Sequence, residues 1–312
     1  MPKFLPIHLA ATAALAFAAQ ASAQSPDFSK AEIKAEVIAP GVAVLFATGG
    51  NVLGGNIGVS YGPDGTVLID DQFAPLTDKI SEAVAKLGAS PVRFLVNTHW
   101  HFDHSGGNEN LGKAGATIYA HDSVRVRLAA GGTTIGNVIP PAPAVALPVV
   151  TYAQGLTFHL NGDEIDAVFT GGGHTDGDTV VFWRNANVVH MGDLMMNGIG
   201  FPFIDLESGG NALHLVATLD QVLTRTNPAT KVIPGHGPVT GQAGLRAWRD
   251  MIAGAVATVR AAQSKKQSLA DFLKANPLKA QEIPGGFISA DAFATAIWKS
   301  LDVKMAAPAH KH

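Results

Sequence analysis

The sequence predicts an α/β protein in which two β-sheets pack together with helices on the outside. Apolar strand-like segments are followed by helix-like segments twice, first up to about residue 130 and again from about residue 157. Strands and helices with one apolar face are stable only when that face is buried against another layer. No internal repeat relates the two halves, and no linker divides them.

The first half predicts strands around a Gly-rich tip, then a helix and further strands. A Pro63-Asp64-Gly65 turn separates two strands, and Ile80, Val84 and Leu87 recur at helical spacing. The segment 131–148 is rich in proline, and we expect it to be irregular. The expected elements are strands at 42–47, 56–61 and 66–70, a helix at 78–87, strands at 92–96 and 116–120, and a helix from Asp122.

The second half restarts with strands and ends with helices. Asn161-Gly162 is a strong signal for a tight hairpin, and Asn185 to Asn187 marks a second turn. The expected elements are strands at 157–160, 165–169, 179–183, 188–190 and 231–233, and helices at about 211–225, 242–264, 269–275 and 290–301.

Residues 1–23 are typical of a secretory signal peptide. Lys3 supplies a short positive region, the run from Ile7 to Ala19 is apolar, and Ala21-Ser22-Ala23 is a cleavage signature. The apolar run is shorter than the ~20 residues that span a bilayer, so we expect no stable membrane anchor. We therefore expect a periplasmic or secreted protein in which residues 24–312 form one domain, with a disordered tail from about residue 304.

Composition favours a small-molecule substrate. The formal charge is −3 for the full sequence, Lys3 is the one charged residue of the signal segment, and no basic cluster follows it. Nucleic acid and anionic membrane surfaces are therefore not expected partners. Cysteine is absent, which excludes disulfides, thiolate ligands and cysteine nucleophiles. The sequence carries no indication of an oligomeric state.

A dense group of metal-binding residues follows the strand at 92–96. His99, His101, Asp103 and His104 lie within six residues. In an extended segment His99 and His101 project from the same side, so both can reach one ion. Asp103 and His104 follow in a turn and point towards a second ion. Dinuclear hydrolytic sites hold their ions ~3.5–4 Å apart, so the motif predicts half of such a site.

Three further candidate ligands lie at strand ends beside glycine. They are His174 in Gly173-His174-Thr175, Asp193 after Gly192, and His236 in Pro234-Gly235-His236-Gly237. Strand exits are where an α/β scaffold presents functional groups. We assign one ion to His99, His101 and His174 and the other to Asp103, His104 and His236. Asp193 then either bridges the ions or belongs to the second.

The motifs H-x-H-x-D-H, G-H-T-x-G, G-D and P-G-H-G, in this order, resemble the metallo-β-lactamase superfamily. The resemblance covers essentially all of residues 24–312. It implies an αββα four-layer sandwich of two mixed sheets flanked by helices, with a dinuclear site between the sheets. The superfamily includes β-lactamases, glyoxalase II-like thioesterases, lactonases, arylsulfatases, nucleases and diiron oxidoreductases, so the substrate stays open.

Local sequence is most similar to the zinc β-lactamases that use a cysteine ligand. Asn97 to His101 carry that similarity, but Asp193 stands where those enzymes have the cysteine. Met196 stands where they have the lysine that binds the substrate carboxylate. The resemblance makes Asn211 a candidate substrate-orienting residue, and Trp100 either lines the mouth of the site or packs beneath it. We expect β-lactam hydrolysis, as a main or a weak activity, with lactonase or thioesterase activity as the alternative.

The donor set favours two zinc ions per chain. Zinc lowers the pKa of bound water from 15.7 to ~7, so a shared hydroxide would be available without a serine or cysteine nucleophile. Asp103 is then the catalytic residue that orients the hydroxide, and Asp70 or Asp71 is a candidate partner for a metal-bound imidazole. Nitrogen and oxygen ligands also admit iron or manganese, so a diiron oxidoreductase remains an alternative. A closed structural zinc site is less consistent with seven donors and no sulfur.

The remaining noticeable residues have structural interpretations. His121, His159, His190 and His214 are expected to be ordinary strand or helix histidines, and His310 and His312 belong to the predicted tail. The apolar tip at Val52 and Leu53 and the loop 201–203 are candidates to cover a substrate, with core packing as the alternative.

Overall fold

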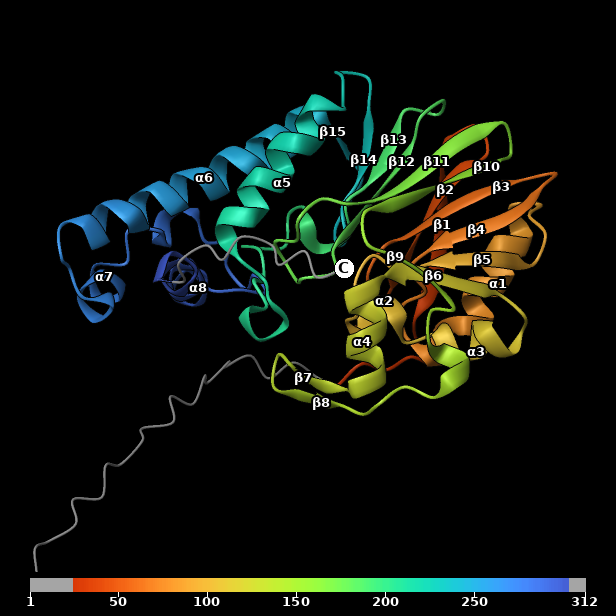
Figure 1. The fold of residues 1–312 in the computed structure, drawn as a ribbon, viewed down its shortest axis with the longest axis horizontal. Helices are drawn as coiled ribbons and strands as arrows, with labels where there is room; N and C mark the ends of the chain where they lie inside the picture. The colour runs from red at the N-terminus through yellow and green to blue at the C-terminus, as the bar shows by residue number, and fades with distance from the viewer. Residues whose placement is uncertain (1–24, 303–312) are drawn as a thin grey trace, which may run out of the picture.

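In the computed structural model, which describes residues 25–302, two mixed β-sheets pack face to face (Figure 1). The seven-stranded sheet contains, in spatial order, β1 (Glu32–Ala39), β2 (Val42–Thr48), β3 (Ile57–Gly62), β4 (Gly65–Ile69), β5 (Val92–Val96), β6 (Thr117–His121) and β9 (Val150–Tyr152). The six-stranded sheet contains β10 (Gly155–Leu160), β11 (Asp163–Phe169), β12 (Thr179–Trp183), β13 (Val188–His190), β14 (Lys231–Ile233) and β15 (Thr240–Gly241). The predicted signal segment and the predicted tail lie outside the described residues.

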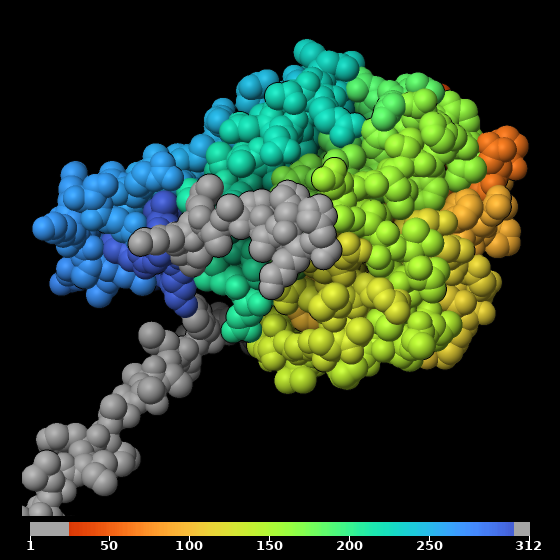
Figure 2. Space-filling view, in the orientation of Figure 1, coloured from red at the N-terminus to blue at the C-terminus, as the bar shows by residue number. Residues whose placement is uncertain are grey.

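Helices cover the outer faces of both sheets (Figure 1). The first half contributes α1 (Thr77–Lys86), α2 (Phe102–Ser105), α3 (Asn108–Lys113) and α4 (Asp122–Ala130). The second half contributes α5 (Ala212–Thr224), α6 (Gln242–Ser264), α7 (Leu269–Ala275) and α8 (Ala290–Asp302), of which α6, α7 and α8 extend beyond the sheets (Figures 1 and 2). Within residues 25–302, no helix combines the length and apolar composition needed to cross a membrane.

Strict alternation along the strands produces the layers. In β2, Val42 and Val44 pack between the two sheets, whereas Ala43 and Leu45 face the core beneath α1. In β12 the same alternation directs Val181 and Trp183 inward and Val180 and Phe182 towards α5 and α6. A period of two places successive side chains on opposite faces of a sheet. Both sheets are therefore buried on two sides, and the predicted αββα sandwich is confirmed.

Strands β1, β7, β8, β9 and β15 and the short helices α2 and α3 were not predicted. Strand β1 has the sequence EIKAEVIA and is mostly exposed at the edge of its sheet, where charged residues protect unpaired backbone groups. The segment expected to be irregular contains a short hairpin of β7 (Gly132–Thr134) and β8 (Asn137–Ile139). β7 and β8 have three residues each and are too short to show a period of two, whereas β1 does alternate, with Glu32, Lys34 and Glu36 between Ile33, Ala35 and Val37.

The last helix completes the core on the outer face of the six-stranded sheet. Phe293 of α8 is fully buried, and its ring stacks on Phe201 with 4.9 Å between the ring centroids. Phe201 comes from the loop after β13, so this contact fixes the loop against the helical layer. One of the aromatic residues considered as a substrate cover is therefore a core residue.

We predict that Phe293→Ala lowers the free energy of unfolding by about 3–5 kcal/mol, because it removes a buried aromatic ring and leaves a cavity. Chemical denaturation of the full chain measures this change. Phe287→Ala is the matched control, since Phe287 is 44% exposed and should cost much less. Equal losses would show that α8 does not complete the core.

Candidate metal centre

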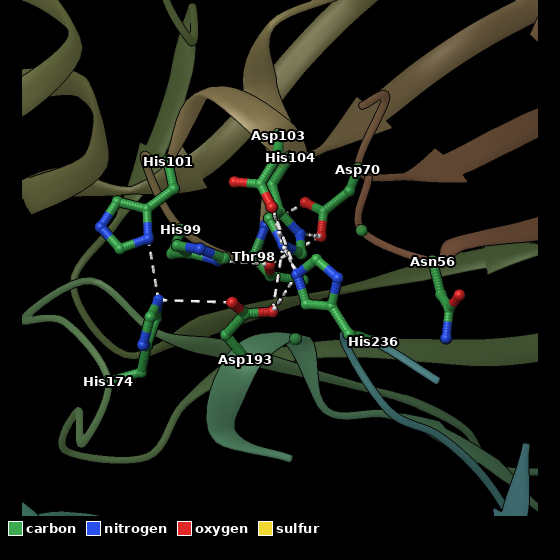
Figure 3. Close-up of polar contacts among 12 residues, drawn as sticks. Asn56, Asp70, Thr98, His99, His101, Asp103, His104, His174, Asp193 and His236 are labelled. Atoms are coloured by element: carbon green, nitrogen blue, oxygen red, sulfur yellow. Dashed lines mark hydrogen bonds and ion pairs between the residues drawn. The ribbon is translucent and has the colours of Figure 1, made fainter. Parts of the chain in front are cut away.

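The seven predicted ligands converge where several strands end between the two sheets (Figure 3). His99 and His101 follow β5, and Asp103 and His104 lie in α2. The other three come from the six-stranded half: His174 precedes β12, Asp193 follows β13 and His236 follows β14. Parallel pairing of β13 with β14 brings the exits of Asp193 and His236 to the same sheet end.

One group consists of His99, His101, His174 and Asp193, whose facing nitrogen and oxygen atoms all lie within 4.8 Å of one another. His101 Nδ1 is 2.9 Å from His174 Nε2, and His174 Nε2 is 3.6 Å from Asp193 Oδ2. His99 Nε2 is buried and makes no hydrogen bond to any residue in 25–302. We call this the first group.

A second group consists of Asp103, His104 and His236. His104 Nε2 and His236 Nε2 face each other at 3.2 Å, and Asp103 Oδ2 lies 3.2 Å from His236 Nε2. Asp103 is the most exposed of the three, with 18% of its side chain accessible, whereas the side chain of His104 is fully buried. Asp103 therefore lies on the open side of this group.

Asp193 lies between the two groups (Figure 3). Its Oδ1 is 3.0 Å from His104 Nε2 and 3.4 Å from His236 Nε2, while its Oδ2 faces His174. One carboxylate thus directs an oxygen to each group. Of the two alternatives for Asp193, this placement favours bridging.

Outer contacts orient the imidazoles. Asp70 Oδ2 lies 2.8 Å from His104 Nδ1 and also accepts a hydrogen bond from the Thr98 hydroxyl, which lies 3.0 Å from His99 Nδ1. His174 Nδ1 donates to the Phe203 carbonyl at 2.7 Å. In each case one ring nitrogen is engaged, and the other is directed into the site.

Of the two candidate imidazole partners, Asp70 therefore contacts a histidine. Asp71 instead accepts from the Gly107 backbone N–H. Sequence reasoning considered Phe203 only as a substrate cover and missed its carbonyl contact, and it missed Asp205, whose Oδ2 lies 2.8 Å from His101 Nε2. Both residues lie outside the ligand motifs, and a single acidic residue in a loop has no distinctive spacing. Burial opposes ionisation of Asp205, but its hydrogen bonds with His101 and Ser208 prevail and lower its pKa to about 2.

The two candidate substrate-binding residues have structural partners. Asn211 is the N-cap of α5, and its side-chain oxygen accepts from the N–H groups of Leu213 and His214. Trp100 is 2% exposed and donates from Nε1 to Ser208 Oγ, so its ring packs beneath the site. These contacts explain both residues without a substrate, and their contact with substrate stays a prediction.

The loops proposed as covers differ in exposure. Val52 packs into the core beneath α1, whereas Leu53 is 62% exposed at the tip. Phe203 is half-buried and lies beside the rings of His101 and His174. Covering of a substrate by Leu53 stays a prediction.

Glycine at two positions lets the backbone approach the donors. A Cβ on Gly55 would lie 2.2 Å from His104 Cε1, and one on Gly235 would lie 2.1 Å from Asp193 Oδ1. Contacts this short would displace the imidazole or the carboxylate. The Gly-rich tip and the P-G-H-G motif therefore close the second group from two directions.

The two groups differ in charge. Burial, together with the neighbouring His101, lowers the pKa of His174 to about 4, and burial also holds the pKa of His99 well below its usual value. Burial opposes protonation of His236 as well, but the carboxylates of Asp193 and Asp103 outweigh it and raise its pKa to about 9. At neutral pH and without metal, His99 and His174 of the first group are therefore neutral, whereas His236 of the second group holds a proton.

The donors fit divalent metal ions. Imidazole nitrogens face each other without a carbonyl or hydroxyl between them, and a buried nitrogen of His99 lacks a hydrogen-bond partner within the described chain. A cation shared by such nitrogens and carboxylates would satisfy all of them. Two candidate sites are present, as a dinuclear centre requires.

Comparisons with known proteins agree with this geometry. A family profile described as the metallo-beta-lactamase superfamily matches residues 50–286. The chain is 28% identical over 178 residues to the type 2 metallo-beta-lactamase of Bacteroides fragilis, covering 56% of this chain and 64% of that enzyme. It is 29% identical over 168 residues to a hydroxyacylglutathione hydrolase of a Polaromonas species, covering 52% of this chain and 55% of that one. The alignments thus span less than two-thirds of these relatives.

Solved structures share the fold. A metallo-beta-lactamase from Pontibacter korlensis superposes with a TM-score of 0.60 at 22% identity, covering 71% of this chain and 99% of that chain. The DIM-1 metallo-beta-lactamase superposes with a TM-score of 0.59 at 21% identity, covering 72% and 98%. At these identities the likeness concerns the fold.

We predict that Gly55→Ala lowers the metal affinity of the second group by about 10- to 100-fold, the range found when the surroundings of a ligand are disturbed. The added methyl group would displace His104. Competition with a chromophoric chelator measures the affinity. Gly254→Ala is the control: Gly254 is exposed in α6 with open space around it, and alanine there should stabilise the helix by about 0.5–1 kcal/mol. Unchanged affinity in Gly55→Ala would contradict the close approach.

We also predict that metal binding at pH 7 releases protons. His236, with a pKa of about 9, is protonated there, and a metal ion requires the neutral ring. Affinity at the second group should therefore rise with pH up to about 9. Calorimetric titration in two buffers of different ionisation enthalpy measures the release, and identical apparent enthalpies would refute it.

Proposed function

We propose that this chain, which belongs to the metallo-beta-lactamase superfamily, is a metal-dependent hydrolase that opens an amide- or ester-type carbonyl. The observation that supports this most strongly is the pair of donor groups joined by Asp193, with no sulfur among them. When bound, two zinc ions would polarise a carbonyl, lower the pKa of water to about 7 and stabilise the leaving anion.

The residues divide the remaining tasks. His99, His101 and His174 would hold one ion, Asp103, His104 and His236 the other, and Asp193 would serve both. Asp103 faces the open side with Oδ2 3.2 Å from His236 Nε2, so it is placed to accept a hydrogen bond from the attacking water and to orient it. The buried partners Asp70 and Phe203 keep the imidazoles in place.

A β-lactam is the first substrate class that we propose, in line with the similarity to the Bacteroides fragilis enzyme. Met196 replaces the lysine that binds a substrate carboxylate in the β-lactamases that the motifs resemble. Its side chain is 2% exposed in the core beside α5 and α6, so a lysine introduced there would be buried rather than offered to substrate. Binding of the carboxylate of a β-lactam would therefore need another group, and this argues for weak β-lactam turnover.

A thioester or lactone is the second candidate. Asp193 in place of a cysteine ligand and the similarity to hydroxyacylglutathione hydrolases favour it. Zinc is the metal that we propose, while iron or manganese would also suit a centre of nitrogen and oxygen donors. Iron with a visible absorption band in protein from its natural host would support a diiron oxidoreductase instead.

We also propose that the protein acts after export. Residues 1–23 combine Lys3, an apolar run and Ala21-Ser22-Ala23, as a cleaved signal peptide does. Amino-terminal sequencing of protein recovered from the periplasm or medium tests this, with a start near Gln24 as the expected result. Recovery of the uncleaved chain from the cytoplasm alone would contradict export.

We predict that removal of metal abolishes hydrolysis and that zinc restores it. The assay uses zinc-loaded protein with a panel of penicillins, cephalosporins, carbapenems, lactones and thioesters. Turnover of β-lactams alone selects the first substrate class, and a preference for thioesters or lactones selects the second. Activity that persists with metal content near zero would refute the proposed mechanism.

Asp103→Ala should lower kcat/KM by about 10²-fold or more, because the water loses its orienting carboxylate. His236→Ala should also lose activity through loss of a donor. His159→Ala is the matched control for it, since the His159 side chain is 73% exposed in β10, away from both groups. Equal activity of the His159 and His236 variants would place the site elsewhere.

A further inference from the structure

His101 is held differently from the other histidines of the first group. It directs Nδ1 into the group, 2.9 Å from His174 Nε2. Its Nε2 points the other way and lies 2.8 Å from Asp205 Oδ2. The Thr134 hydroxyl of the β7–β8 hairpin also approaches Nε2, at 3.1 Å. The outward side of His101 is therefore enclosed by a carboxylate and a hydroxyl.

The chemistry of this contact fixes which nitrogen is free. An ionised carboxylate can only accept a hydrogen bond, so His101 Nε2 must carry the proton that it donates to Asp205. In a neutral imidazole the other nitrogen then keeps its lone pair. Asp205 thereby selects the tautomer whose Nδ1 can bind a metal ion, and it fixes the rotation of the ring.

The Asp205 carboxylate is itself immobilised. Ser208 donates from its hydroxyl to Oδ2 at 2.6 Å and from its backbone N–H to Oδ1 at 3.1 Å. Trp100 donates from Nε1 to the Ser208 hydroxyl at 3.0 Å. Asp205 is 3% exposed, so water competes little for it. The chain of contacts begins at Trp100, which precedes His101, and returns to His101 through Ser208 and Asp205.

The same loop serves one group and not the other. Phe203, two residues before Asp205, accepts the proton of His174 Nδ1 with its carbonyl. Residues 203–208 thus orient two of the three histidines of the first group. His104 of the second group is oriented by Asp70 instead. Asp70 follows β4 of the seven-stranded sheet, whereas residues 203–208 follow β13 of the six-stranded sheet.

We propose that Asp205 is a positioning residue for the first group: it holds His101 with Nδ1 free and thereby sets the metal affinity of this group without contacting the ion. The proposal rests on the proposed metal-dependent function. The proposal predicts different effects at the two groups, since loss of Asp205 should lower the affinity for the first-group ion and leave the affinity for the other ion unchanged.

The test is a metal titration of the full chain carrying Asp205→Asn, with zinc affinities measured by competition with a chromophoric chelator. We expect one ion to bind as in the unaltered protein and the other to bind about 10- to 100-fold more weakly. Asp176→Asn is the matched control: the Asp176 side chain accepts from Arg127, its backbone N–H donates to the Ser208 carbonyl of the same loop, and it makes no hydrogen bond to a histidine of either group. It should bind both ions normally.

Cobalt(II) identifies which ion is affected. The visible spectrum of Asp205→Asn loaded with one cobalt ion should match that of His174→Ala, which lacks a first-group donor, and differ from that of His236→Ala. Equal weakening of both ions, or loss at the second group, would overturn the proposal. Failure of the unaltered chain to bind any metal would instead refute the proposed function itself.

Stability of the metal-free chain separates positioning from a purely structural role. If Asp205 only stabilised the loop, Asp205→Asn would lower the unfolding midpoint of the metal-free chain and leave both metal affinities unchanged. That result would also overturn the proposal. If Asp205→Asn does not fold, Ser208→Ala provides the second variant. It removes the hydroxyl that fixes Asp205 Oδ2, and it should weaken the first-group ion alone, by less than the change at Asp205.

Discussion

The rest of the centre depends on the hydrogen bonds that the buried carboxylate of Asp70 accepts. It accepts from the backbone N–H and the hydroxyl of Thr98 and from His104 Nδ1, and Thr98 in turn meets His99. Asp70 is fully buried at the end of β4 with a left-handed φ of 66°, a conformation that costs about 1–3 kcal/mol in residues other than glycine. The fold maintains it because one carboxylate orients a histidine in each group.

Charge is the second constraint on the site. Six of the seven ionisable donors are buried between two apolar sheets, where an unpaired charge is costly, and Asp103 lies at the open side. Asp193 and Asp103 compensate the proton on His236 of the second group, whereas burial favours the neutral forms of His99 and His174 in the first group. The same carboxylates that stabilise protons at His236 would stabilise a cation in their place, so the metal-free protein already has the charge distribution that a dinuclear centre needs.

The substrate depends on the surroundings of the centre more than on the donors. Asp193 replaces sulfur with oxygen, and the buried Met196 offers no cation, so both a metal ligand and the carboxylate-binding group differ from those of the resembled β-lactamases. Relatives of both the β-lactamase and the hydroxyacylglutathione hydrolase kind share this level of similarity. The predicted substrate cover at Leu53, together with the ring of Phe203 beside His101 and His174, is where we expect substrates to be distinguished.

The sequence by itself determined the layers and the seven candidate donors. The apolar run at 179–183 and the helical spacing in 242–264 are local patterns, and the bounds of both elements agree with prediction. His99 and His101 lie on the same side of an extended segment, and Asp103 and His104 follow in a turn. This local pattern assigns the two pairs to different groups, as the structure does. The edge strand β1 was not predicted although charged and apolar residues alternate along it, since the strand is charged and mostly exposed rather than an apolar core segment.

Only the tertiary structure decided how the donors are held. Asp193 lies between the groups because two strands from distant parts of the chain end side by side, and Asp205 meets His101 across 104 residues. The burial of Trp100 likewise depends on Ser208, which lies in a distant loop. Contacts between distant residues leave no periodic pattern in a sequence. The identity of the donors was therefore readable from spacing, whereas their orientation depended on packing.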